Sequence, residues 1–410
     1  MIELACVFEE AGRPIRGYLA VDRFVCGSSS GGVRMRPDLT SEELRLLASR
    51  MTLKYGFLGI PQGGAKAGIA FDAGAPDESR RRVLFSFGRE LFPLVRSRAF
   101  IPGPDMGTTP DDIRFLFAGA GRKPSRIKFS EVGSGAYTGL SVFAGAEAAL
   151  AERGKSIRGA AVAIEGFGKV GASAARLFFQ SGAKVVAVST QEGGLFLDRG
   201  LPVPELIEAA KVQGPSFVRD FPAAGKISKD DLLGLDVDVL SPCSLSRTIH
   251  AGNAETVRAG IISSGANAPL TAEAEMRLHS RSVLVLPDFM TSSGGVLGIF
   301  LEIGGFRSPE IARLVPELIA PRIRELIRVS EARGVPPQMI AAGAALERFA
   351  RLKEKAEAAS SGGRLFRHKT VRSIRRLAPR IVAKRLGLAY FKRNLAGPMF
   401  GEAGSRPPET

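Results

Sequence analysis

The first third of the chain places apolar residues at spacings that predict one amphipathic helix. The apolar positions between Leu44 and Met51 recur at helical spacing. Residues 40–43 have the order of a capping box, in which the Thr40 hydroxyl accepts a helix amide and the Glu43 side chain reaches back. A helix is therefore predicted to begin at Thr40, with Lys54 near its end.

The segments around this helix predict strands and turns. Short apolar stretches suit strands, and clusters of glycine and serine suit turns. The predictions are strands at 18–21, 23–26, 56–60 and 69–71, a glycine and serine turn at 27–32, a tight loop at 61–68 and a helix over 77–94.

The middle of the chain predicts a strand, helix and strand unit. Residues 160–165 are apolar enough for a parallel strand that is buried on both faces. A long helical pattern at 140–151 precedes this strand, and a helix at 172–180 and a strand at 184–189 follow it. Further strands at 237–240, 260–263 and 282–286, then helices at 310–332 and 337–358, complete an α/β chain.

Composition limits the class of protein. The chain has 410 residues, 45% hydrophobic and 24% charged, which excludes a mostly disordered or collagen-like chain and favours two domains.

No apolar run reaches the roughly 20 residues that cross a bilayer, and acids stand early in the sequence, so we expect a soluble protein that is not exported. The three cysteines form no CxxC pair, which indicates reduced thiols and a cytoplasmic location. The three histidines have no ligand spacing, so no metal site is predicted.

The net charge of +16 is concentrated near the C-terminus. Residues 351–410 hold 15 lysines and arginines against 4 acids, which accounts for +11. Residues 360–363 are predicted to form a flexible joint, and a basic amphipathic segment with Pro379 inside it follows. Such a segment binds nucleic acid or an anionic membrane, or it is a solvated or oligomer-packing extension, and the pattern leaves both interpretations open.

Residues 166–171, Gly-Phe-Gly-Lys-Val-Gly, lie between a predicted buried strand and a helix. In that context the first glycine permits a tight turn, the second lets pyrophosphate approach the backbone and the third lets the helix pack closely. A dinucleotide site is predicted, and the alternative is a glycine-rich turn that closes an unliganded sheet. Thr190 stands where an acid usually holds the ribose diol, so the choice between NAD and NADP stays open.

Two lysines and a carboxylate form the candidate chemistry of the first region. Lys54, Lys66 and Asp105 suit an amino-acid substrate, because one cation binds a carboxylate while a desolvated, crowded lysine has a lowered pKa and activates water. The flanking glycines let backbone and substrate come close. The alternative for each lysine is an ordinary solvated surface charge.

On these motifs the sequence resembles the glutamate, leucine, phenylalanine and valine dehydrogenase superfamily over about residues 16–355. The matching segments follow in order at 31–34, 51–54, 61–68, 104–108, 138–139, 166–171, 252–254, 265–269, 287–288 and 293–296. The resemblance implies a two-domain α/β fold with a substrate and oligomerisation domain at 1–130, a Rossmann-type NAD(P)-binding domain at 131–305 and helices at 306–358 that return to the first domain. The charge distribution adds a basic tail at 359–410.

The resemblance also implies an activity and its residues. The activity is oxidative deamination of an L-amino acid to its 2-oxo acid and ammonia with NAD or NADP, in a homo-oligomer. Lys54 would bind the substrate carboxylate, Lys66 would activate water and Asp105 would exchange protons with the amino group. Coenzyme residues would be Gly166, Phe167, Gly168, Lys169, Val170, Gly171, Thr190, Thr138 and Asn267, and further substrate residues Ser30, Gly31, Gly32, Val296 and Ile299.

Departures from the family pattern bear on the substrate. Glutamate enzymes have a lysine where this chain has Ser30, and a serine where it has Ile299. A distal carboxylate would be buried without these partners, so an uncharged substrate is predicted. Ser292 and Gln62 also depart from the usual residues. Ser30, Thr190, Ser292 and the basic tail keep open a non-catalytic dinucleotide-binding scaffold or sensor with a polyanion-binding tail.

Overall fold

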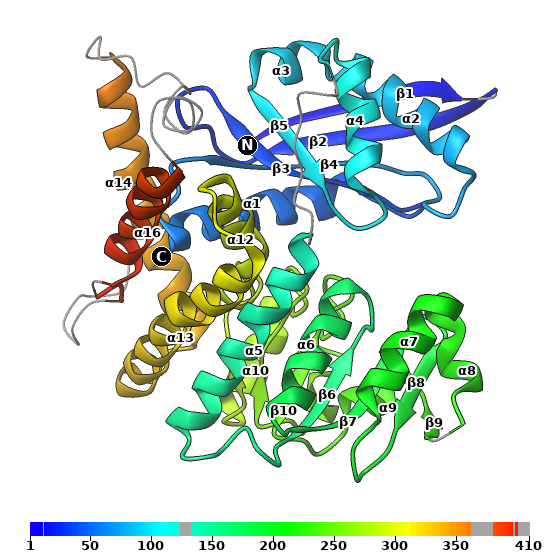
Figure 1. Ribbon diagram of the computed structural model, residues 1–410, viewed down its shortest axis with the longest axis vertical. Coiled ribbons are helices and arrows are strands. Elements are labelled where there is room, and N and C mark those ends of the chain that lie inside the picture. Colours follow the sequence, from blue (N-terminus) through cyan, green and yellow to red (C-terminus); the bar gives the residue numbers. More distant parts are fainter. Residues whose placement is uncertain (11, 124–132, 223, 362–379, 397, 401–410) are drawn as a thin grey trace. The chain divides into compact units, whose positions relative to one another are not determined.

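The computed structural model divides the chain into two compact units (Figure 1). It describes residues 1–410 except 11, 124–132, 223, 362–379, 397 and 401–410. The first unit comprises Met1–Glu131 and Ala345–His368, and the second comprises Val132–Ala344 and Lys369–Thr410. Among the described helices, none is long and apolar enough to cross a lipid bilayer.

The first unit is built on a five-stranded mixed sheet with the order β1-β2-β4-β3-β5. β1 and β2 are antiparallel to each other, β2 is antiparallel to β4, and β3 runs parallel to both β4 and β5. The strands are β1 (Ile2–Glu10), β2 (Arg13–Val21), β3 (Ser29–Met35), β4 (Gly63–Ile69) and β5 (Phe100–Pro104).

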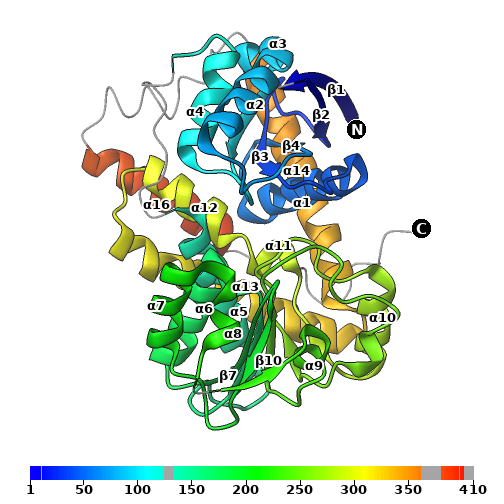
Figure 2. The same cartoon turned by 90° about the vertical axis from the view of Figure 1, so that its right-hand side faces the viewer.

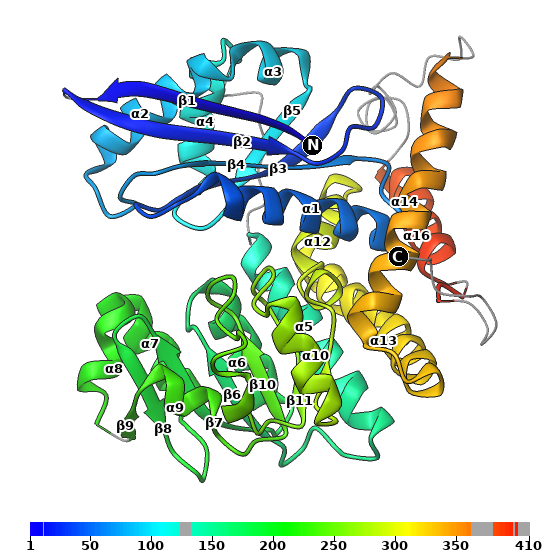
Figure 3. The ribbon, with the colours of Figure 1, turned by 180° about the vertical axis from the view of Figure 1, so that it is seen from behind.

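Helices cover both faces of this sheet, as Figures 1 and 3 show. Helix α1 (Ser41–Leu58) packs on β2 and β4 from one side, and α2 (Asp77–Glu90), α3 (Phe92–Ser97) and α4 (Pro110–Gly119) lie on the other. The larger core lies on the side of α2 to α4 and contains the fully buried Phe87 and Phe100. From Ala345 onward the first unit includes the later part of α14 (Pro337–Ser361), whose Arg348 donates to the Phe57 carbonyl of α1.

The sequence predictions for this unit are confirmed at the start of α1 and wrong around the glycines. Residues 56–58 are the last turn of α1, the predicted loop at 61–68 is mostly β4, and the predicted turn at 27–32 is mostly β3. The expected strand at 23–26 contributes only a bridge between Val25 and Ser28. Glycine serves close packing here, because a Cβ on Gly64 would lie 2.4 Å from the Thr52 nitrogen of α1.

The second unit contains a seven-stranded sheet with the order β12-β11-β10-β6-β7-β8-β9 (Figure 2). The five strands from β12 to β7 are parallel, and β8 and β9 extend the sheet antiparallel. The strands are β6 (Ala161–Glu165), β7 (Lys184–Thr190), β8 (Gly193–Phe196), β9 (Gly225–Ile227), β10 (Val239–Pro242), β11 (Ile261–Ile262) and β12 (Leu284–Val285). β8 and β9 were not predicted, because their short segments carry little alternation.

Helices connect these strands and continue after the sheet. They are α5 (Ser134–Glu152), α6 (Lys169–Gln180), α7 (Val203–Gln213), α8 (Phe217–Asp220), α9 (Lys229–Leu233), α10 (Ala272–Ser280), α11 (Asp288–Thr291), α12 (Gly294–Ile303) and α13 (Ser308–Arg333). α13 packs along α5, so its contacts group it with the second unit, whereas the sequence prediction returned this helix to the first. Its buried apolar stripe, which includes Leu318 and Ile319, explains this grouping.

The described part of the basic tail forms helix α16 (Arg380–Ala396), which packs on α13. Lys384 Nζ contacts both carboxylate oxygens of Glu310 at 2.7 and 2.8 Å, and Phe391 and Leu395 are buried. This part of the tail is therefore docked on the protein. The predicted joint and the basic segment over 362–379 lie outside the described residues.

Candidate active site

Lys66 lies on β4, which has β2 and β3 as its neighbours. Alternation along the strand places Ala65, Ala67 and Ile69 in the core under α2 to α4, so Lys66 points to the face that α1 covers. Its side chain is 5% exposed, and Nζ lies 2.7 Å from Asp105 Oδ2. The sequence interpretation of Lys66 as a loop residue was wrong, and the strand fixes its position more firmly than a loop would.

Asp105 directly follows β5, and the next turn orients it. The Asp105 amide donates to Thr108 Oγ1 at 2.9 Å, and that hydroxyl donates to the Val33 carbonyl of β3 at 2.8 Å. Gly107 has φ +78°, and a Cβ there would lie 2.0 Å from a backbone oxygen. The turn therefore ties Asp105 to the neighbouring strand and requires glycine at position 107.

Arg34 belongs to the site, although the sequence interpretation did not single it out. Its Nε donates to Asp105 Oδ2 at 3.1 Å, so Arg34 and Lys66 contact the same oxygen. Its Nη1 donates to Glu43 Oε1 at 2.6 Å, and Arg36 Nη2 donates to Glu43 Oε2 at 2.7 Å. The strand alternation could have found Arg34, because Val33 and Met35 face the core and Arg34 therefore shares the face of Lys66.

The predicted capping box at the start of α1 is confirmed for Thr40 and wrong for the Glu43 side chain. Thr40 is the N-cap of α1, and its hydroxyl accepts from the Glu43 amide, as predicted. The Glu43 carboxylate, however, accepts from Arg34 and Arg36. The two guanidinium groups, of which that of Arg34 is buried, compete for it more strongly than one backbone amide does, because hydrogen bonds between charged groups are stronger.

The charges in this cluster perturb each other's pKa. Burial lowers the pKa of Lys66 and the positive charge of Arg34 lowers it further, although Asp105 acts in the opposite direction. Burial alone would raise the pKa of Asp105, but Lys66 and Arg34 together hold it well below its usual range. The site thus combines a firmly ionised carboxylate with an amine that loses its proton more easily than an ordinary lysine.

Four of the residues predicted to contact substrate lie on β3 and α1 of the first unit. Ser30 Oγ and Tyr55 Oη share a hydrogen bond of 2.5 Å, and burial raises the pKa of Tyr55 to about 12. Lys54 is 5% exposed. Gly31 lies against β4, where a Cβ would come within 1.7 Å of the Ala65 oxygen, and a Cβ on Gly32 would lie 2.7 Å from Asp105 Cβ.

The glycine segment after β6 has the geometry of a phosphate cradle. Gly166 has φ +94°, and a Cβ on Gly171 would lie 1.9 Å from the Gly166 oxygen, so both positions require glycine. A Cβ on Gly168 would meet nothing within 4 Å, which leaves this backbone open to a ligand. Gly168 is the N-cap of α6 and supplies no side-chain cap, so the first amides of the helix fit the pyrophosphate of a dinucleotide.

Three of the other predicted coenzyme residues make hydrogen bonds or packing contacts within the chain. The Thr190 hydroxyl donates to the Pro215 carbonyl at 2.8 Å and accepts from the Glu192 amide at 3.1 Å. Phe167 packs against Phe217 with ring centroids 5.4 Å apart. Thr138 Oγ1 donates to the Ser134 carbonyl at 2.9 Å. The remaining three, Lys169, Val170 and Asn267, are at least partly exposed.

Val296 and Ile299 lie three residues apart on α12 and are both partly exposed. They therefore share one face of the helix. Both side chains are apolar. Val296 and Ile299 belong to the second unit, whereas Ser30 and Lys66 belong to the first.

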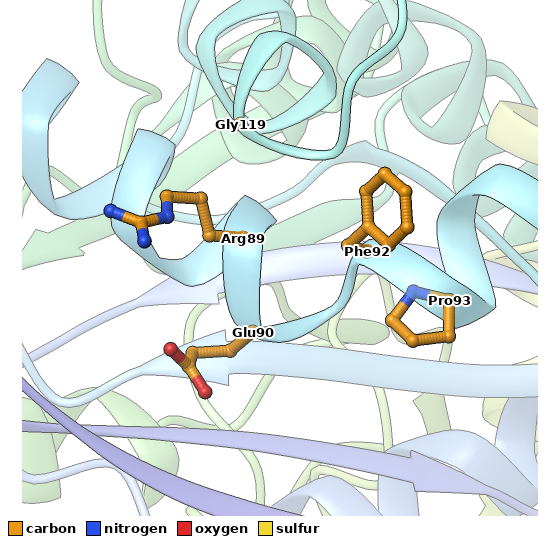
Figure 4. A pocket seen from close by; sticks show the side chains of 5 residues that line it. All are labelled: Arg89, Glu90, Phe92, Pro93 and Gly119. Atoms are coloured by element: carbon orange, nitrogen blue, oxygen red, sulfur yellow. The ribbon is translucent and has the colours of Figure 1, made fainter.

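A hollow of about 450 Å³ lies elsewhere in the first unit (Figure 4). It is lined by Arg89, Glu90, Phe92, Pro93 and Gly119. The charged ends of Arg89 and Glu90 point in different directions, and none of the predicted site residues lines it. Among the described residues, no group of three histidine, cysteine or acidic side chains could hold a metal ion.

Comparison with known proteins places this geometry in a family. The protein-family model described as "Glutamate/Leucine/Phenylalanine/Valine dehydrogenase" matches residues 132–356. A second family model, described as "Glu/Leu/Phe/Val dehydrogenase, dimerisation domain", matches residues 4–120. The chain belongs to this family, which confirms the resemblance and the two-domain α/β fold. It is an amino-acid dehydrogenase, an oxidoreductase that uses NAD or NADP.

Similar proteins are glutamate dehydrogenases. The chain is 36% identical over 303 residues to the glutamate dehydrogenase of Thermotoga maritima, covering 70% of this chain and 71% of that one. It is 33% identical over 319 residues to the NADP-specific glutamate dehydrogenase of Saccharolobus shibatae, covering 72% and 74%. The crystal structure of the hetero-hexameric glutamate dehydrogenase from Thermus thermophilus in its Leu-bound form is 30% identical, with a TM-score of 0.73 and coverage of 86% and 88%.

Proposed function

We propose that the protein oxidatively deaminates an L-amino acid whose side chain carries no charge. Amino acid, water and NAD(P)⁺ give the 2-oxo acid, an ammonium ion, NAD(P)H and a proton. The buried contact of 2.7 Å between Lys66 and Asp105 carries this proposal, because the reaction needs a base for water and a proton acceptor for the amino group.

Four side chains of the first unit have roles in this reaction. Lys54 binds the α-carboxylate of the substrate, Asp105 accepts a proton from the substrate ammonium group, and the neutral amine of Lys66 takes a proton from the attacking water. Arg34 keeps Asp105 ionised and favours the neutral amine of Lys66. The bound coenzyme supplies the hydride acceptor, and the chain cradles it through the glycine segment before α6.

The environment of Ser30 supports an uncharged substrate. The Ser30 hydroxyl is already bonded to Tyr55, so this position offers a neutral pair of hydroxyl groups instead of a cation. A distal carboxylate would be desolvated there without an opposite charge, at a cost of several kcal/mol. The similar proteins are called glutamate dehydrogenases, so the choice between glutamate and an uncharged amino acid as the preferred substrate tests this proposal most sharply.

The test is an assay of the purified chain with L-amino acids and both coenzymes, and with the matching 2-oxo acids in the direction of amination. We expect the highest kcat/KM with an uncharged amino acid. K66A should lower kcat by about 100-fold to 10,000-fold while the fold is retained. The matched control is K155A, since Lys155 pairs with Asp238 on the surface of the second unit. Full activity of K66A would refute the mechanism, and coenzyme binding without any turnover would favour the scaffold.

We further propose that the chain works as a homo-oligomer in the cytoplasm. The family model over residues 4–120 is described as a dimerisation domain, and the similar Thermus thermophilus protein is a hexamer of unlike chains. The three cysteines are free, as a reducing compartment would keep them. Light scattering on the purified chain should give a mass of at least two chains of 43.5 kDa, and the mass of a single chain would contradict the proposal.

A further inference from the structure

Glu165 is a buried carboxyl group for which the described residues provide no ion pair. It is the last residue of β6, directly before Gly166, and it is 6% exposed. Ser244 Oγ donates to its Oε1, while Oε2 has no hydrogen-bond partner within the part of the chain that the structure describes. Burying a carboxylate in this way is costly, so a carboxyl group there retains its proton more readily.

The position of Glu165 in the sheet is where open α/β sheets bind their ligands. The chain leaves β6 for β7 on one side and later returns to β10 on the other, so the strand order reverses between β6 and β10. Glu165 pairs with Pro242 of β10, and its partner Ser244 follows that strand at the same carboxyl edge. A dinucleotide binds in the crevice at such a switch point.

The glycine cradle holds Glu165 next to the backbone that would bind the coenzyme phosphates. A Cβ on Gly166 would lie 2.8 Å from Ser244 Cβ, so the cradle and the Glu165–Ser244 contact form one packed unit. The coenzyme pyrophosphate carries two negative charges. An ionised Glu165 would oppose them in a poorly solvated place, whereas a neutral Glu165 would not, and its free Oε2–H could donate to the coenzyme or to a bound water.

Other charged groups around Glu165 do not neutralise it. On α9, which packs on β6 and β7, Lys229 lowers the pKa of Glu165, but its side chain is exposed. After β10, the Cys243 amide donates to the Glu165 carbonyl at 2.7 Å, and its thiol keeps its proton because burial and Glu165 raise its pKa to about 12. β7 contributes the neutral Ser189, and Lys169 at the start of α6 is exposed. Burial outweighs the hydrogen bond from Ser244, and the pKa of Glu165 is raised.

We propose that Glu165 makes coenzyme binding proton-linked: the neutral carboxyl group admits NAD(P), and the carboxylate opposes it. Glu165 is a positioning residue of the coenzyme site, separate from the chemistry at Lys66. The inference rests on the dinucleotide site alone, so it does not depend on which amino acid is deaminated. Coenzyme affinity should fall as pH rises through the pKa of free Glu165, by at most about tenfold per pH unit for one linked proton.

The experiment measures the Kd of NADH and NADPH for the full chain without substrate, by coenzyme fluorescence, from about pH 5 to about pH 9. Calorimetry in two buffers of different ionisation enthalpy measures the protons taken up on binding. E165Q keeps the shape of the side chain and cannot ionise. We expect its Kd to be independent of pH, and at the alkaline end about tenfold or more below that of the wild type.

Two further variants make the test specific. S244A removes the hydroxyl that donates to Glu165 and leaves the Ser244 backbone amide, which also lowers the Glu165 pKa, so the pH at which affinity is lost should move upward. D238N is the matched control. Asp238 stands just before β10, at the opposite edge of the same sheet, where it pairs with Lys155. Removal of the Asp238 charge should therefore leave the pH profile of coenzyme binding unchanged. Identical profiles for wild type and E165Q, or no proton uptake, would overturn the proposal. Loss of deamination with an intact pH-dependent Kd would instead refute only the proposed activity.

Discussion

Arg34 offers the most direct test of how the site controls its protons. R34M replaces the guanidinium by an apolar side chain of similar length and removes one of the two cations on Asp105. Both cations contact Oδ2, Lys66 at 2.7 Å and Arg34 at 3.1 Å, so their nitrogens lie within about 6 Å of each other. At an effective dielectric constant of about 20, their repulsion is about 3 kcal/mol. This repulsion favours the neutral amine, and R34M removes it.

The sign of the effect follows from the role of Lys66. A base must be neutral, so kcat/KM for the amino acid rises with pH through the pKa of Lys66 in the free enzyme. Arg34 lowers that pKa, and its removal should move the acid limb of the profile to higher pH. The assay is the initial rate of coenzyme reduction at subsaturating amino acid over a series of pH values. An acid limb that stays in place or moves downward would refute the electrostatic role of Arg34.

Two controls separate this effect from damage to the fold. R36M removes a guanidinium that pairs with Glu43 and Asp38 but makes no ion pair with Asp105, so it should leave the acid limb in place. R34M breaks a buried pair and should lower the free energy of unfolding by about 3 to 5 kcal/mol, which urea unfolding measures. R34K retains the charge, so its acid limb should stay closer to that of the wild type even if stability falls.

Three further predictions concern packing, substrate choice and thiol chemistry. G31A should lower the free energy of unfolding by about 3 kcal/mol because its Cβ would meet a β4 carbonyl at 1.7 Å, while G103A, with 4.0 Å of space, should stay within about 1 kcal/mol of wild type. S30K should raise the ratio of kcat/KM for glutamate to kcat/KM for uncharged amino acids by about tenfold or more. An unchanged ratio would show that Ser30 does not contact the substrate side chain. Burial and Glu165 raise the pKa of Cys243 to about 12, so mass spectrometry should find exposed Cys26 alkylated first at about pH 8.

In the second unit, the parallel strands and the helices α5, α6 and α13 could be predicted because each carries one dominant pattern, whereas the helices from α7 to α12 were not predicted. The apolar run before Gly166 is β6, and the helix after it begins at Lys169. The first unit was harder because its central strands are rich in glycine. In β3 and β4 glycine allows close approach of backbones, as at Gly31 and Gly64, and a local pattern cannot distinguish this from a turn. The distinction depends on which strand or helix lies opposite, and that is a tertiary property.

The same limit applied to the candidate site. Lys66 and Asp105 were predicted as site residues, and the structure brings their charged atoms together. Arg34 and Glu43 were missed as part of the cluster, because the pairing of β3 with β4 and the position of α1 decide that these side chains meet. Strand alternation alone would have placed Arg34 on the face of Lys66. Glu165 gave no sequence signal, since a carboxylate at the end of a strand is unusual only once its burial is known.

The two proton-linked groups act in opposite directions, and this combination makes a sharper prediction than either group alone. Lys66 works when it is neutral, which favours high pH, whereas Glu165 admits coenzyme when it is neutral, which favours low pH. The profile of kcat/KM for the coenzyme should therefore be bell-shaped, with each limb assigned to a different unit of the chain. E165Q should abolish the alkaline limb and leave the acid limb, and R34M should move the acid limb alone. A variant that shifted both limbs together would show that one group, or one conformational step, controls both, and the separate assignment of Lys66 and Glu165 would then be wrong.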